Sequence, residues 1–143
     1  MAKRQAIGAA FLASAVLCGA ALAQGAMSIA NRDVVGDWTL RITPAERQDL
    51  KITFQSRDGG PFTLPLTITT QANGRLACVV GGDPAECRIR DGRLVVVSSS
   101  GSGVRMTFTL ADRTREGFSG AASLRIRLLP IGGSVGAVTM ARR

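Results

Sequence analysis

The cysteines are the residues whose spacing most clearly permits chemistry. The chain has 143 residues, with three cysteines and no histidine. Cys78 and Cys87 are separated by eight residues, a spacing that fits neither a structural zinc site nor a C-x-x-C redox pair. An even number of cysteines in an oxidising compartment pairs into disulfides. If processing removes Cys18, we expect a structural Cys78–Cys87 disulfide and neither a metal nor a cofactor.

The chain lacks most of the side-chain combinations that common enzyme active sites use. Without histidine it has no Ser-His or Cys-His pair and no imidazole for acid–base work. A Ser-Lys dyad would need Lys51, which falls on the polar side of an alternating segment. Turn formation accounts for the carboxylates beside glycine and other turn signals, which are Asp58, Asp83, Asp91, Asp112 and Glu116. The sequence therefore predicts that the protein is not an enzyme.

The N-terminus has the order of a cleavable signal peptide. Lys3 and Arg4 precede an apolar run at residues 6–17, and Ala21-Leu22-Ala23 precedes Gln24, so residues 1–23 are predicted to be removed. Two alternatives remain open, namely a retained membrane anchor over residues 6–23 and a lipid-modified Cys18. We expect export to the periplasm or the medium, with no transmembrane span after cleavage and two cysteines left.

Short segments of alternating apolar and polar residues fill the rest of the chain. Trp38, Leu40 and Ile42, for example, alternate with polar neighbours, as in strands with one buried face. Turn signals such as Asn73-Gly74 and Asp91-Gly92 separate the segments. The connections are too short for parallel crossovers, so the strands are predicted to be antiparallel. They are expected near 34–42, 49–56, 61–70, 74–80, 86–90, 93–98, 103–111, 117–128 and 134–142.

These strands predict a single all-β domain over residues 34–143, preceded by a flexible segment at 24–33. An open sheet of eight or nine strands would leave two unpaired edges and an uncovered apolar face. Closure into an antiparallel meander β-barrel removes both problems, because about eight strands enclose an interior that side chains can fill. A two-sheet sandwich is the alternative fold.

Residues 35–40, with the sequence VGDWTL, resemble the G-x-W entry strand of lipocalins and other calycins. Residues 90–96, 117–120 and 132–142 are similar to small exported bacterial calycin-like domains, a group without a shared activity. The resemblance implies that Trp38 closes the barrel beneath an arginine of the last strand. Arg142 fits this role, since it shares parity with Val138 and Met140. The chain departs from the family in lacking tyrosine, and hence G-x-W-Y, and a recognisable middle motif.

The apolar side of the predicted strands offers one candidate site. Gly120 and Ala122 fall on this inward side, where they either leave space or fit a tight taper. The interior is therefore either a packed core or a lumen that carries a small apolar ligand. The candidate ligand-lining residues are Phe54, Phe62, Leu64, Leu66, Met106, Phe108 and Phe118.

The arginines offer a second candidate site, with ordinary solvated outer strand faces as the alternative interpretation. The formal net charge is +8, and a basic surface attracts anionic partners over long range. Arg125 and Arg127 share one strand face, while Arg88, Arg90 and Arg93 flank the cysteine hairpin. For an exported protein the expected anionic partners are lipid head groups or envelope polymers. Nucleic acid is not expected, because the aromatic residues are in phase with the core and form no stacking platform.

Three functions follow as hypotheses, and all three act by binding. The first is a carrier of a small apolar ligand in the cell envelope. The second is a protein-binding module, since G-x-W-x-L at residues 36–40 is similar to the start of exported bacterial inhibitors of metalloproteases. In that case residues 24–33 would be the segment inserted into the protease. The third is a structural or electrostatic module that uses the arginine faces at the envelope.

Overall fold

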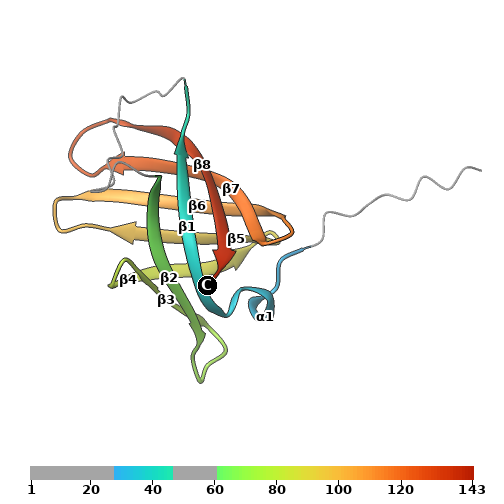
Figure 1. The fold of residues 1–143 in the computed structure, drawn as a ribbon. Coiled ribbons are helices and arrows are strands. Elements are labelled where there is room, and N and C mark those ends of the chain that lie inside the picture. The colour runs from blue at the N-terminus through green and yellow to red at the C-terminus, as the bar shows by residue number, and fades with distance from the viewer. Residues whose placement is uncertain (1–27, 47–60) are drawn as a thin grey trace, which may run out of the picture.

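Antiparallel strands close into a barrel in the computed structural model, which describes residues 28–46 and 61–143 (Figure 1). Each strand pairs with the next, and the last pairs with the first, so the closed all-β meander is confirmed and the sandwich is excluded. The predicted strand at 49–56 and the predicted signal peptide at 1–23 lie outside the described residues. The described strands are β1 (Gly36–Pro44), β2 (Phe62–Thr70), β3 (Leu76–Val80), β4 (Asp83–Arg90), β5 (Arg93–Ser99), β6 (Val104–Arg113), β7 (Gly117–Ile126) and β8 (Gly132–Arg142).

The alternation in sequence becomes an alternation between barrel interior and solvent. In β1, Trp38, Leu40 and Ile42 are buried, and Asp37 and Arg41 are exposed. The turn from β4 to β5 is the tight Asp91-Gly92 hairpin, in which both residues have positive φ, 50° and 71°, as a two-residue type I′ turn requires.

A short helix, α1 (Asn31–Val34), precedes β1 and lies against one end of the barrel (Figure 1). Ile29, just before it, is only 1% exposed and donates its backbone N–H to the carbonyl of Gly92 at 3.0 Å. Residues 28–33, predicted to belong to a flexible segment, therefore pack on the barrel. Val34, predicted to start the first strand, is instead the last residue of the helix.

The two ends of the barrel carry different connections. The end next to α1, called the α1 end below, holds the β4–β5 and β6–β7 turns. Evidence for this is the contact of Ile29 with Gly92 and of Asp33 with Arg113. The β5–β6 turn and the β7–β8 connection lie together at the opposite end, where Arg127 donates its backbone N–H to the carbonyl of Gly103 at 2.9 Å.

Candidate functional site

Trp38 and Arg142 meet at the α1 end. The two residues lie directly opposite each other on β1 and β8, and the guanidinium carbon of Arg142 is 4.3 Å from the centroid of the Trp38 ring. The indole is 2% exposed and donates its N–H to the carbonyl of Val34 at 2.7 Å. Phe118 packs on the ring from the side, 5.7 Å between centroids. The polar edge of the indole is therefore satisfied within the chain, and the arginine covers one face of the ring.

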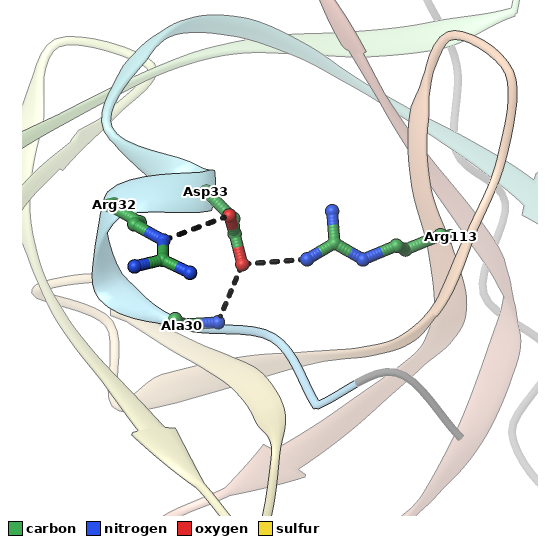
Figure 2. A network of polar contacts seen from close by, with 4 residues as sticks. All are labelled: Ala30, Arg32, Asp33 and Arg113. Atoms are coloured by element: carbon green, nitrogen blue, oxygen red, sulfur yellow. Dashed lines mark hydrogen bonds and ion pairs between the residues drawn. The ribbon is translucent and has the colours of Figure 1, made fainter. Parts of the chain in front are cut away.

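A polar network ties α1 to β6 at the same end (Figure 2). The Asp33 carboxylate accepts the backbone N–H of Ala30 at 2.9 Å and a guanidinium N–H of Arg113 at 2.6 Å, and lies 3.9 Å from Arg32. The bond from Ala30 lowers the pKa of Asp33 below its ordinary value of 3.8. The two arginines lower this pKa further, and desolvation opposes them. Asp33 therefore remains ionised at neutral pH and fastens the helix to the barrel.

The predicted disulfide is confirmed. Cys78 in β3 and Cys87 in β4 are bonded, with 6.0 Å between their Cα atoms. Within residues 28–46 and 61–143, no three His, Cys, Asp or Glu residues gather as metal ligands do. No helix in these ranges is long and apolar enough to cross a bilayer.

The predicted ligand-lining residues belong to the core or pack against it. Leu66, Phe108 and Phe118 are buried, and Phe62, Leu64 and Met106 are half-buried against the same cluster. Phe54 lies outside the described residues. None of the other six lines either of the two hollows described below.

At Gly120, one of the small inward residues, the backbone of the neighbouring strand lies too close to leave free space. A Cβ atom there would collide with the carbonyl oxygen of Thr109 on β6. Its neighbour on the same side, Ala122, is fully buried. These two positions therefore fit a tight taper between β6 and β7.

The larger hollow, about 1250 Å³, is open to solvent and lies over β5, β6 and β7. Its floor includes the outward-facing Val97, Thr107 and Ser123, which lie side by side on the three strands. Residues 127–131, which connect β7 to β8, form its wall at the end of the barrel, together with Gly132 and Gly133 at the start of β8. The smaller hollow, about 650 Å³, lies beside the disulfide.

The β7–β8 connection differs from the sequence-based prediction. Alternation predicts a strand that continues to residue 128 with Leu128 on its buried side, but β7 ends at Ile126. There the chain turns, and Ile126 donates its N–H to the carbonyl of Ile131 at 3.1 Å. As a result Leu128, Leu129 and Ile131 are 92%, 52% and 37% exposed. We call these three residues the apolar tip.

Three arginines lie beside the apolar tip. Arg105 and Arg125 are directly opposite each other on β6 and β7, and Arg127 follows two residues after Arg125. All three are exposed and line the larger hollow. No described aspartate or glutamate lines this hollow or pairs with any of the three. We call Arg105, Arg125 and Arg127 the basic patch.

An unpaired basic patch is energetically unfavourable for the isolated fold. Like charges directly opposite on antiparallel strands destabilise the pair. Some of the other described arginines have acidic neighbours, as Arg90 has Asp91 and Arg113 has Asp33. The patch can donate hydrogen bonds to two or more oxygens of one anion, since each guanidinium group presents a fork of N–H donors that matches phosphate and carboxylate.

Sequence reasoning recognised Arg125 and Arg127 but missed Arg105 and the apolar tip. The only local signals for the tip are Pro130 and Gly132-Gly133, which interrupt the alternation just after it. The pairing of Arg105 with Arg125 depends on strand register, which no single segment of sequence displays.

No protein-family model matches this chain, and no curated protein or solved structure matches it either, so the geometry of its own residues is the basis for the function proposed below.

Proposed function

We propose that this protein is an exported, non-catalytic binding protein that holds phosphate-bearing anionic groups through its basic patch. The observation that carries the proposal is the cross-strand pair of Arg105 and Arg125, which is exposed and has no acidic partner among the described residues. Arg127 extends the same cluster along β7. A bound anion would relieve the repulsion between the two guanidinium groups and use their unpaired donors.

The sheet makes the patch a suitable binding site. Arg105 and Arg125 project from paired strands near one end of the barrel, and each strand is also paired with a neighbour on its other side, so the backbone beneath the two arginines is held on both sides. Because the backbone is already ordered, a ligand has to order only the side chains and not the chain beneath them. The adjoining hollow leaves room for a ligand larger than a single phosphate group.

Export is supported by two observations. The Cys78–Cys87 disulfide suits an oxidising compartment, and residues 1–23 have the order of a signal peptide.

A calycin-like origin for the barrel is also part of this proposal. Its support is the closed eight-strand meander of the described residues and the placement of Trp38 beneath Arg142.

The other two functions predicted from sequence have less support. A carrier of an apolar ligand stays a prediction, because the described interior residues pack as core. An inhibitor that inserts residues 24–33 into a protease would have to detach part of that segment. Ile29 is buried and Asp33 is bonded to Arg113, so residues 28–33 are already engaged by their own barrel.

The proposal is tested by isothermal titration calorimetry of the processed chain with inositol hexakisphosphate, a soluble probe that carries several phosphate groups. We expect binding that weakens as salt rises, because exposed charges are screened. The double variant Arg105→Gln/Arg125→Gln should bind at least tenfold more weakly, since each lost charged hydrogen bond contributes about 1.5–3 kcal/mol.

The matched control removes the same charge from another place on the barrel. Arg41→Gln/Arg93→Gln changes two exposed arginines on β1 and β5 that have no ion pair in the described residues. This control should keep most of the affinity. Equal losses in both double variants would mean that net charge alone attracts the probe and that the basic patch is not a site. No binding by the unmodified chain would refute the function.

A further inference from the structure

The apolar tip and the basic patch form one continuous surface at the end of the barrel. Arg125 and Arg127 lead directly into Leu128 and Leu129 along the chain, and Arg105 lies opposite Arg125. Exposed apolar side chains that cluster on a surface mark a site of association with a protein or a membrane. Of the four large apolar side chains that are exposed among the described residues, three belong to this tip.

The structure holds the tip in a fixed shape. The Arg127 N–H bonds to the Gly103 carbonyl in the β5–β6 turn, and the Leu129 N–H lies 3.4 Å from the Ile126 carbonyl. The tip is thus fastened both to its own strand and to the neighbouring turn at this end of the barrel (Figure 1). Leu128 and Leu129 therefore project beyond the strands without support from the core.

We propose that this surface docks on an anionic lipid bilayer, with the apolar tip placed among the acyl chains and the basic patch on the lipid phosphates. The inference rests on the proposed function, because it assigns the phosphate groups held by the arginines to lipid head groups. Arginine suits the boundary between water and lipid, since its aliphatic stem lies along apolar groups while the guanidinium stays at the polar level.

A bilayer fits this surface better than a second copy of the chain does. Two copies that met tip to tip would bring two basic patches together, and like charges across an interface are strongly unfavourable. Three aliphatic side chains also fall well short of the roughly 800 Å² per partner that a standard protein interface buries. An anionic membrane, in contrast, complements the charge of the patch and needs only a small insertion.

The test measures co-sedimentation of the processed chain with two kinds of vesicle, phosphatidylcholine alone and phosphatidylcholine mixed with phosphatidylglycerol. We expect binding to the mixed vesicles only. Arg105→Gln/Arg125→Gln should weaken this binding by more than tenfold, since each arginine near an anionic surface contributes about fivefold. Leu128→Ser/Leu129→Ser should weaken it by at least tenfold as well, because the transfer of each leucine to the acyl region is lost.

Val79→Ser is the matched control for the tip. Val79 is another exposed aliphatic residue, 41% accessible, on β3 and away from the β7–β8 connection. Its replacement should leave vesicle binding unchanged. The tip variant should keep the urea midpoint of the unmodified chain, because its side chains are exposed. It should also keep the affinity for inositol hexakisphosphate, because the basic patch is intact.

Insertion is measured directly with Leu128→Trp and vesicles that carry bromine on the acyl chains. The natural Trp38 is buried at the α1 end, so quenching by the bromine reports the tip. Quenching on mixed vesicles is expected. Vesicle binding without quenching, or equal binding by the tip variant, would show a purely electrostatic contact and refute the insertion.

The remaining outcomes separate this inference from the proposed function. If the chain binds inositol hexakisphosphate but neither vesicle, the bilayer is wrong and the phosphate site stands. If it binds neither the probe nor the vesicles, both proposals are wrong. If sedimentation velocity shows a dimer that Leu128→Ser/Leu129→Ser abolishes, the occupant of the tip is a second copy and the bilayer is refuted.

Discussion

The Cys78–Cys87 disulfide joins the two strands of the barrel that are paired over the shortest length. The ladder between β3 and β4 has three directly opposed residue pairs, from Cys78–Ala85 to Val80–Asp83, whereas every other pair of neighbouring described strands has at least five. A closed barrel depends on every ladder, so this junction is where opening is least opposed by hydrogen bonds. We predict that removing the disulfide destabilises the whole domain.

The magnitude follows from the length of the closed loop. The two cysteines are nine positions apart, so the disulfide closes a loop of ten residues. The chain-entropy model gives about 2.7 kcal/mol of stabilisation for such a loop at 25 °C. With an unfolding entropy of roughly 2.1 cal/mol/K per residue, a domain of about 115 residues should lose on the order of 10 °C in Tm.

The assay is urea unfolding followed by the fluorescence of Trp38, the single tryptophan of the chain. The variant is Cys78→Ala/Cys87→Ala, because Cys78 is 4% exposed and a serine there would bury a hydroxyl group. The unmodified chain with its disulfide reduced is the control that keeps both sulfur atoms in place. A loss below about 1 kcal/mol in both samples would refute the reasoning, since the ladder would then hold without the crosslink.

Two further predictions concern the α1 end. The folded-state pKa of Asp33 lies below 3.8, so its stabilising contribution is complete above that pH and is lost as the pH falls through the folded value. Asp33→Asn should therefore lower the free energy of unfolding at neutral pH and make that free energy depend less on pH in the acid range. Urea unfolding at a series of acidic pH values measures this dependence. If the dependence is unchanged in the variant, the role given to Asp33 is wrong. Arg142→Met should lower the free energy of unfolding by about 1 kcal/mol and shift the fluorescence emission of Trp38, because the cation over the ring is lost. Arg142→Lys keeps the charge and should show smaller changes in stability and emission. Equal losses of stability in the two variants would show that the charge is unimportant there.

The fold was predictable because its main determinants are local. Period-two alternation marks the buried side of each strand, and Asp91-Gly92 marks a turn whose two positive φ angles suit these residues. Closure follows from the number of strands and the lack of a helix to cover them. The meeting of Trp38 and Arg142 could be anticipated from parity and family resemblance, since closure of a meander places the first and last strands together.

The candidate site was hidden because it depends on where strands end and how they pair. Alternation continues through Leu128, but the backbone bonds that close the β7–β8 turn end the strand at Ile126. Arg105 and Arg125 are twenty positions apart, and only the register of β6 and β7 makes them neighbours. Ile29 is similar, because its burial depends on the shape of the barrel end and leaves no periodic pattern in the sequence.

The contrast between the two ends of the barrel is itself an argument for binding at the second. At the α1 end, Asp33 accepts from Arg113, and Arg142 covers Trp38, so these four side chains find their partners within the chain. At the opposite end, Arg105 faces Arg125 without an acidic neighbour, and Leu128 is almost fully exposed. Folding gains nothing from a like-charge pair or from an exposed leucine. A partner that carries anionic groups over an apolar layer would satisfy both features at once, and an anionic bilayer has that structure.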